Sequence, residues 1–174
     1  MIALAYCAGW LSGIGITAGA HRLWSHKTYT ASLPLRMLLS VLFTMAGQND
    51  IYTWARDHRL HHKFTETDAD PHNSRRGAFF AHVGWLLTKK HPDVLIKGRT
   101  IDHQDLIDDR VVYYNKKYYV LWYLLFRVYI PSMIPAWLFG EELRYCVIGC
   151  LAQYIAGLHT TWFVNSAAHM FGDR

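Results

Sequence analysis

The chain has 174 residues, of which 52% are hydrophobic and 18% charged, and it carries a formal net charge of +5 with 11 histidines. This length suits one domain, and the composition excludes disordered, collagen-like and low-complexity chains. Residues 1–20 and 145–168 contain no Asp, Glu, Lys or Arg, and residues 118–140 contain only Arg127. Each stretch is close to the ~20 apolar residues that cross a hydrocarbon core of ~30 Å. The sequence therefore predicts three membrane spans and argues against a soluble globular domain.

Residues 21–117, between the first and second predicted spans, hold most of the Lys, Arg and His residues. The apolar run Leu35–Ala46 in this region contains Arg36 and is too short to cross a membrane. It predicts a helix packed at the interface or a re-entrant element. Turn residues and apolar periodicity then predict a helix at Tyr52–Lys63 and a turn-rich segment at 65–77. They also predict a short apolar helix at Ala78–Thr88 and a mixture of helix and loop at 93–117.

The pattern of a transmembrane β-barrel is absent from the sequence, so the spans are predicted to be helices. We expect an all-α fold, an integral membrane helical bundle with a helical cytosolic cap at 21–117, and a single domain over 1–174. The basic excess of the cap predicts that it faces the cytosol. Its charge suits anionic lipid headgroups, a phosphorylated substrate or an acidic partner, and we expect no nucleic acid partner. Glycine pairs at four-residue spacing, Gly9 with Gly13 and Gly15 with Gly19, predict close helix packing.

Three clusters of metal-ligand residues lie near the same predicted membrane boundary. They are His21 with His26, His58 with His61 and His62, and Asn165 with His169. Neutral imidazole is a ligand for iron, zinc, copper and nickel. Six imidazoles exceed the needs of one tetrahedral zinc ion, so the clusters predict a site for two metal ions. Ionisable groups at the edge of a membrane span are functional candidates in their own right.

Helical spacing indicates which of these side chains can meet. Residues three or four apart share one face of an α-helix, so the three histidines of the second cluster are predicted to converge on one region. The same spacing predicts that Asn165 and His169 converge. Residues five apart share a face less well, so His21 and His26 either bracket a metal pair or flank a helix end. The remaining histidines receive no ligand role, and His159 is interpreted as a helix-packing or tunnel residue; the others are His72, His82, His91 and His103.

The clusters and their flanking residues resemble membrane acyl-CoA desaturases of the stearoyl-CoA Δ9 type. Gly15–His26 resembles the first histidine box of that family, Trp54–Lys63 the second, and Asn165–His169 its Asn-Ser-Ala-Ala-His motif. Gln48–Asp50, Asp68–Gly77 and His82–Leu87 are also similar to the family. The resemblance covers essentially the whole chain. The family carries one further span before this region and one further HxxHH box after it, so the resemblance implies an internal fragment that lacks the last histidine box.

The resemblance implies an oxygen-dependent reaction that inserts a cis double bond, at Δ9, into a saturated fatty acyl-CoA during fatty acid biosynthesis. It implies cytochrome b5 and its reductase as electron donors, and a multi-pass protein of the endoplasmic reticulum membrane whose histidine boxes face the cytosol. It further implies two non-haem iron ions and no catalytic residue beyond their ligands, which are His21, His26, His58, His61, His62 and His169, with Asn165 acting through a water molecule.

The resemblance also implies two groups of substrate-binding residues. The kink of the acyl tunnel would be lined by Gln48, Trp54, Thr161 and Trp162. The CoA group would be contacted by Asn49, Arg56, Asp57, Lys89 and Lys90. Core packing and an ordinary basic surface are the alternative interpretations of these residues.

Other functions remain open at the level of sequence. A membrane diiron fatty-acid or sterol hydroxylase uses similar histidine boxes and differs only after the first C–H bond is cleaved. A non-enzymatic membrane module, such as a haem-bearing helical bundle, is a different class of function. A catalytically incomplete truncation product is a further alternative for this chain.

Overall fold

A computed structural model describes residues 2–171 of the chain, and its side chains from Leu4 onward. Across these residues the regular structure is helical and includes no strand. The predicted all-α fold class is therefore confirmed. A helix satisfies its backbone hydrogen bonds internally, so this fold suits a chain with long apolar segments.

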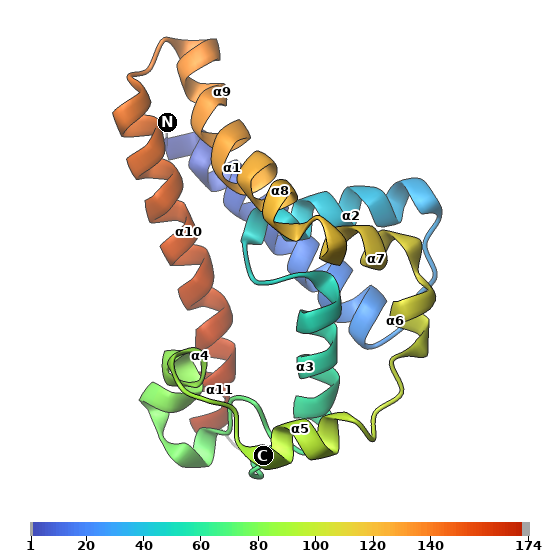
Figure 1. Ribbon diagram of the computed structural model, residues 1–174. Helices are drawn as coiled ribbons and strands as arrows, with labels where there is room; N and C mark the ends of the chain where they lie inside the picture. The colour runs from blue at the N-terminus through green and yellow to red at the C-terminus, as the bar shows by residue number, and fades with distance from the viewer. Residues whose placement is uncertain (1, 172–174) are drawn as a thin grey trace.

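An elongated bundle forms one end of the molecule (Figure 1). Its elements are α1 (Ile2–Ile14), α8 (Tyr119–Trp122), the π-helix η4 (Tyr123–Tyr129), α9 (Ile130–Phe139) and the first part of α10 (Leu143–Asn165). α10 continues along the molecule to its other end, where α11 (Ala167–Met170) lies. α8, η4 and α9 form one continuous helix, and α10 returns beside it after a turn at Gly140. α1 and α9 both pack against α10. The two long segments therefore make the helical hairpin that the sequence predicts.

Two helices within residues 2–171 are long and apolar enough to cross a membrane, Tyr119–Phe139 and Leu143–Met170. They coincide with the second and third predicted spans. The first predicted span falls on α1 and the start of the helix that follows it, and its residue 1 lies outside the described residues. The span over 1–20 and the division of the chain into spans and a cap therefore stay predictions.

Arg127 is the one charged residue of the second predicted span, and it is buried in the hairpin with 4% of its surface exposed. Its Nη1 donates to Oε1 of Gln153 at 2.7 Å, and its Nη2 donates to the carbonyl of Cys150 at 2.7 Å. Its guanidinium also lies over the Tyr154 ring, 4.5 Å from the centroid. A charge at this depth needs such partners, and these three contacts tie η4 to α10.

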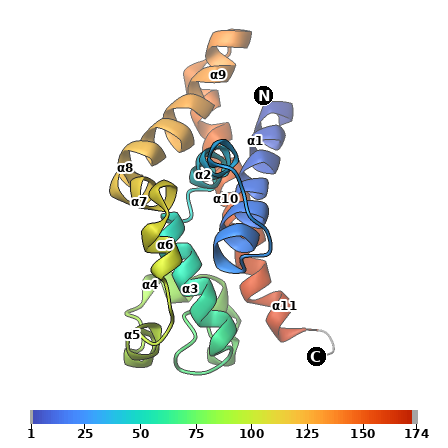
Figure 2. The ribbon, with the colours of Figure 1, turned by 90° about the vertical axis from the view of Figure 1, so that its right-hand side faces the viewer.

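The other end of the molecule holds shorter helices (Figure 2). They are the π-helix η1 (Gly15–Ser25), α2 (Leu33–Ala46), α3 (Ile51–Lys63), the 3₁₀ turn η2 (Ser74–Arg76), the π-helix η3 (Phe80–Gly84), α4 (Trp85–Leu87), α5 (Pro92–Gly98), α6 (Gln104–Asp108) and α7 (Arg110–Lys117). The helices predicted at Leu35–Ala46 and Tyr52–Lys63 correspond to α2 and α3. The buried core of this end joins η1, α2, α3, α6 and α7.

Gly15 brings η1 and α2 into direct backbone contact. A Cβ atom at this position would lie 2.2 Å from the backbone nitrogen of Phe43 and 2.3 Å from the carbonyl carbon of Leu42. At Gly19 a Cβ would lie 3.2 Å from the ring of Trp24 and 3.4 Å from Cβ of Leu39. The close packing predicted for this glycine pair is confirmed. At Gly13 a Cβ would meet nothing within 4 Å, so the small residue there serves no close packing in the described structure.

Candidate metal centre and substrate cavity

Helix α3 carries the central histidines, and local sequence sets where it begins. The Oδ1 atom of Asp50 accepts a hydrogen bond from the backbone nitrogen of Thr53 at 2.9 Å, which is an N-cap. The helix then runs without Gly or Pro to Lys63. Residues four apart on it share a face, so His58 and His62 point the same way.

Four side chains form the first histidine group: His21, His26, His58 and His62. One ligand nitrogen from each lies within 4.8 Å of one from every other member. The Nε2 atom of His58 is 3.1 Å from Nε2 of His26 and 3.0 Å from Nε2 of His62. Converging nitrogens of this kind are the donor set that a transition-metal ion requires.

The π-helical form of η1 explains how His21 and His26 meet. The backbone nitrogen of His26 donates to the carbonyl of His21 at 3.0 Å, an i→i+5 bond. A π-helix stacks residues five apart more nearly above one another than an α-helix does, and the two rings lie 4.5 Å apart between centroids. Both rings therefore belong to one histidine group, and they do not lie on opposite sides of a metal pair. The expectation that this spacing shares a face poorly was therefore wrong, because it assumed an α-helix.

Burial and neighbouring charges lower the pKa of three members of the first histidine group, His21, His58 and His62. Burial, followed by the neighbouring imidazoles of His62, His21, His26 and His61, lowers the pKa of His58 to about 2. Burial and the same neighbourhood lower the pKa of His62 to about 4. The Trp54 ring stacks on His58 at 4.8 Å and supplies part of that burial. Neutral imidazole is the form that binds metals, so the cluster is prepared for a cation.

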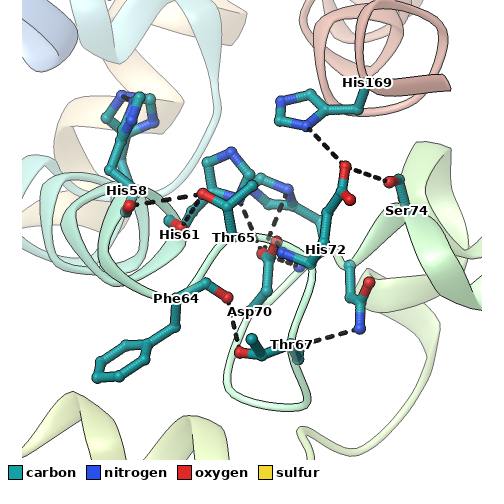
Figure 3. Close-up of polar contacts among 12 residues, drawn as sticks. His58, His61, Phe64, Thr65, Thr67, Asp70, His72, Ser74 and His169 are labelled. Carbon is teal, nitrogen blue, oxygen red and sulfur yellow. Dashed lines mark hydrogen bonds and ion pairs between the residues drawn. The ribbon is translucent and has the colours of Figure 1, made fainter. Parts of the chain in front are cut away.

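The second histidine group consists of His61, His72 and His169, with Asp70 beside them (Figure 3). The His61 ring lies 4.2 Å from His72 and 4.9 Å from His169 between centroids. The Nδ1 atom of His61 is 2.9 Å from Oδ1 of Asp70. Ligand atoms of His61, Asp70 and His72 lie within 4.8 Å of one another, which makes a second set of potential metal donors.

Burial and partners shape this group as well. Burial, and then His61, lower the pKa of His72 to about 4, although Asp70 opposes them. Burial on its own would raise the pKa of Asp70, but the hydrogen bond from His61 and the charge interaction with it lower that pKa overall. The result is an ionised Asp70 carboxylate beside a neutral His72 imidazole. Such a carboxylate fixes the ring orientation and the tautomer of a ligating histidine.

α3 divides its histidines between the two groups and does not send all three to one point. His61 turns to Asp70, and its ring centroid is 6.3 Å from that of His58 and 5.4 Å from that of His62. The prediction of one convergent region was therefore wrong, because His61 faces a loop that follows α3. Asn165 and His169 are separated by the helix break at Ser166, and Asn165 lines the cavity described below.

Sequence reasoning missed His72 and Asp70 as members of the site. Their exposed fractions are 7% and 4%. The available signal was the segment Asp70-Pro71-His72, in which an acid and a histidine follow an HxxHH cluster. Proline positions such a pair in a turn, and polar side chains on a turn are buried only where they have partners.

Arg59 was also missed, and it ties α3 to η1. Its Nη2 donates to the carbonyl of Trp24 at 2.6 Å and its Nε donates to the carbonyl of Ser25 at 3.2 Å. Two further bonds, at 2.9 and 2.7 Å, run from Nη1 and Nη2 to the carboxylate of Asp105. Arg59 thus caps the carbonyl end of η1, where His21 and His26 lie. The planar fork of an arginine is needed for this geometry.

A cavity of about 270 Å³ lies beside the histidine groups, between α3 and α10. His58, His72 and Asn165 contribute to its wall. Six of the predicted substrate residues also line it: Gln48, Asn49, Trp54, Asp57, Thr161 and Trp162. Gln48 Nε2 donates to Thr161 Oγ1 at 2.7 Å, which joins the loop before α3 to α10. The volume is near the lower end of the ~300–1,000 Å³ of small-molecule sites.

Two of the other predicted CoA residues, Arg56 and Lys90, are joined to the cavity through Asp57. Asp57 accepts from Arg56 Nε at 2.8 Å and pairs with Lys90 Nζ. Asp57 therefore joins Arg56 to Lys90 and neutralises part of their charge. Lys89 is exposed, and no polar contact within the described residues joins it to this group.

His159 contributes to helix packing. Its Nδ1 lies 2.9 Å from Nε2 of His82, whose Nδ1 lies 2.9 Å from Oγ of Ser166. This chain of contacts joins η3 to the break between α10 and α11. The contact is consistent with the helix-packing interpretation of His159.

Comparison with known proteins gives this geometry a context. No family model matches the chain. Stearoyl-CoA desaturase 5 of Bos taurus is 50% identical to it over 171 residues, which are 98% of this chain and 51% of that protein. Stearoyl-CoA desaturase 4 of Mus musculus is 55% identical over 94% of this chain and 47% of that protein. An acyl-CoA Delta-9 desaturase of Acheta domesticus is 53% identical over 94% of this chain and 46% of that protein.

The chain thus spans about half the length of the curated relatives it matches. Their similarity extends over both histidine groups and the cavity, since it covers nearly all of the chain. The predicted resemblance is confirmed, and the chain belongs to the acyl-CoA desaturase family.

Proposed function

We propose that the chain forms part of an acyl-CoA desaturase that inserts a cis double bond, at Δ9, into a saturated fatty acyl-CoA. The observation that carries the proposal is the gathering of six predicted ligand histidines into two adjacent groups, in a chain half identical to named desaturases. In the overall reaction two hydrogens leave the acyl chain. O₂ takes up these two hydrogens together with two electrons and two protons, and two molecules of water form.

The proposed cofactor is a pair of non-haem iron ions. The first histidine group offers four converging nitrogens to one ion, and His61 and His169 offer theirs to the other. Asn165 would act through a water molecule. An unactivated methylene has no acidity for a base to exploit, and iron supplies the oxidising chemistry that its cleavage requires. The chain's own part is to hold neutral imidazoles in fixed orientations.

The cavity is the proposed acyl site. Gln48, Trp54, Thr161 and Trp162 line it beside His58, and the Gln48–Thr161 hydrogen bond stiffens the wall where the chain must bend. At the outer edge of the cavity, the phosphates and amides of CoA would be bound by Asn49, Arg56, Lys90 and the exposed Lys89. Charged donors form strong hydrogen bonds with phosphate oxygens. Asp57 holds two of these cations in place.

The proposed partners and location follow from the family and from charge. Cytochrome b5 and its reductase would supply the electrons, with O₂ as the oxidant. The two membrane-length helices fit a membrane protein, and we propose the endoplasmic reticulum with the histidine groups on the cytosolic side. The excess of Lys and Arg in residues 21–117 supports this orientation.

Product analysis tests the proposal. The full-length protein is expressed in a host without its own Δ9-desaturase, and fatty acids are analysed by mass spectrometry with localisation of the double bond. We expect cis-monounsaturated acids with the double bond at Δ9. A dominant hydroxy-acid would identify a hydroxylase instead, and the lack of any modified acid would contradict the proposed function.

A pair of histidine variants makes the test specific to the site. His61→Gln removes a member of the second histidine group and is expected to abolish the unsaturated product. His91→Gln changes a histidine that caps α5 far from that group in sequence, and it should leave the product unchanged. Equal products from both variants would contradict the proposed role of His61.

A further inference from the structure

Residues 64–73 form a loop directly after α3 that carries two buried acids, one of which, Asp70, is labelled in Figure 3. Glu66 is 8% exposed and Asp70 is 4% exposed. The loop is closed by Asn73, whose Nδ2 donates to the carbonyl of Thr67 at 2.9 Å. Carboxylates are almost never buried unless they are paired, so their partners indicate what they do.

Asp70 accepts three hydrogen bonds. Its Oδ1 accepts from Nδ1 of His61 at 2.9 Å and from the backbone nitrogen of His72 at 3.1 Å, and its Oδ2 accepts from the backbone nitrogen of Glu66 at 2.9 Å. An ionised carboxylate only accepts, so the proton of the His61 ring lies on Nδ1. The Nε2 atom of His61 is then a bare lone pair, which is the form that binds a metal.

Glu66 lies behind His169 in a similar way. Its Oε1 accepts from Oγ of Ser74 at 3.1 Å and is 3.8 Å from Nδ1 of His169. Its backbone has φ of +60°, in the left-handed region that residues other than glycine seldom adopt. A glutamate held in that conformation with a buried carboxylate points to a role beyond loop closure.

We propose that Asp70 and Glu66 are positioning residues of the metal centre. Each holds the Nδ1 side of one histidine, His61 or His169, and so presents the opposite Nε2 to a metal ion that neither acid touches. One short loop would thereby align ligands from two separate helices, α3 and α11. The proposal rests on the metal centre of the proposed function, but it does not rest on the reaction.

The first histidine group lacks this arrangement. Within residues 2–171, no hydrogen bond or ion pair joins a carboxylate to any of its four imidazoles; their nitrogens approach one another instead. Loss of an acid from the 64–73 loop should therefore weaken one metal position and spare the other. A carboxylate behind a ligating histidine is typically worth about 10–100-fold in metal affinity.

The test measures metal binding by the full-length protein, purified in detergent and titrated with Co²⁺ as the only metal. The variants are Asp70→Asn and Glu66→Gln, and the matched control is Asp108→Asn, an exposed acid of α6 that belongs to no candidate metal group among the described residues. Absorption of bound Co²⁺ reports the ligand geometry, and equilibrium titration reports the affinity. A His26→Ala background disables the first histidine group, so that the remaining signal belongs to the second.

We expect Asp70→Asn and Glu66→Gln to weaken Co²⁺ binding by about 10–100-fold in the His26→Ala background and to alter its spectrum. Binding at the first histidine group should match the parent protein, and so should the Co²⁺ affinity and spectrum of Asp108→Asn. Glu66→Gln carries the test alone if Asp70→Asn does not fold, because glutamine can still accept from Ser74. Unchanged affinity and spectrum in Glu66→Gln and Asp70→Asn would overturn the proposal, as would equal weakening of both histidine groups.

The outcome is independent of the chemistry that the metal performs. A protein that shows the selective loss of Co²⁺ but makes no double bond would overturn the proposed function and leave this proposal standing. If the protein makes the double bond while both variants bind Co²⁺ normally, the proposed function stands and the positioning role of Asp70 and Glu66 is overturned.

Discussion

Helix α3 contributes histidines to both groups, yet the two groups are oriented by different physical means. The first is shaped by helix geometry: an i→i+5 bond aligns His21 with His26, and an α-helical turn aligns His58 with His62. The second is shaped by side chains of a loop, since Asp70 contacts His61 and Glu66 lies near His169. Backbone changes should therefore damage the first group most, and single carboxylate changes the second.

Asp105 supports the first histidine group indirectly, through Arg59. Asp105 binds Arg59, and Arg59 binds the backbone carbonyls of Trp24 and Ser25 at the end of η1. In the second group the acid contacts the imidazole itself. This contrast teaches that one α-helix can supply histidines to two sites that are supported differently. One site is supported through the backbone of the neighbouring η1, and the other through side chains of the loop that follows α3.

The largest expected effect comes from Gly15→Ala. The added Cβ would meet backbone atoms of Phe43 and Leu42 at 2.2–2.3 Å, and no side-chain rotation can relieve that overlap. We expect η1 to separate from α2, with a loss of stability at or above the ~1–3 kcal/mol typical of overpacking. Thermal unfolding in detergent measures the stability, and metal titration should show loss of the first histidine group.

Gly13→Ala is the matched control for this prediction. It adds the same methyl group to the same continuous helix, where nothing lies within 4 Å. Alanine is favoured over glycine in a helix by about 1 kcal/mol, so this variant should be as stable as the parent or slightly more stable. Equal stability of the two variants would show that the helices are not in the contact described.

The sequence predicts the parts of the site that depend on regular spacing. The gathering of the candidate histidines, the all-α fold class and the Gly15–Gly19 packing were predicted from the apolar pattern, the histidine clusters and small-residue spacing. The π-helix was not predicted, because nothing in Gly15–Ser25 distinguishes an i→i+5 ladder from an α-helix until it packs on α2. Asp70 and His72 were missed for a related reason: a turn-rich segment indicates a loop but not which way its side chains face. The split of His61 from His58 and His62 depends on that loop.

A smaller effect is expected from Arg59→Lys. Lysine keeps the charge but cannot donate to two carbonyls and a carboxylate together, so the bonds to Trp24 and Ser25 would be lost. We expect destabilisation of about 2 kcal/mol, as for one or two bonds from a charged donor. Co²⁺ titration should show weaker binding at the first histidine group and normal binding at the second.

Arg99→Lys provides the control for the same chemical change at an exposed position. Surface substitutions of this kind usually stay within about 0.5 kcal/mol. If Arg59→Lys weakened only the second histidine group, the assignment of Arg59 to the support of η1 would be wrong.

The smallest expected effect is a pH dependence of the contact between Arg59 and Asp105. Burial on its own would raise the pKa of Asp105, but hydrogen bonds from Arg59 and Lys27 outweigh it and lower the pKa from 3.8 to about 2. A carboxyl whose folded pKa is lowered adds stability above its unfolded pKa, and that contribution is lost as the pH falls from about 4 towards 2. At pH 7, Asp105→Asn should therefore be less stable than the parent and unfold at a lower temperature. The loss in the free energy of unfolding should be less than about 1 kcal/mol, because the carboxylate is a third exposed. In metal-free protein the difference should shrink between pH 4 and pH 2, and a difference that persists unchanged to pH 2 would mean that the contact supports η1 by shape and not by charge.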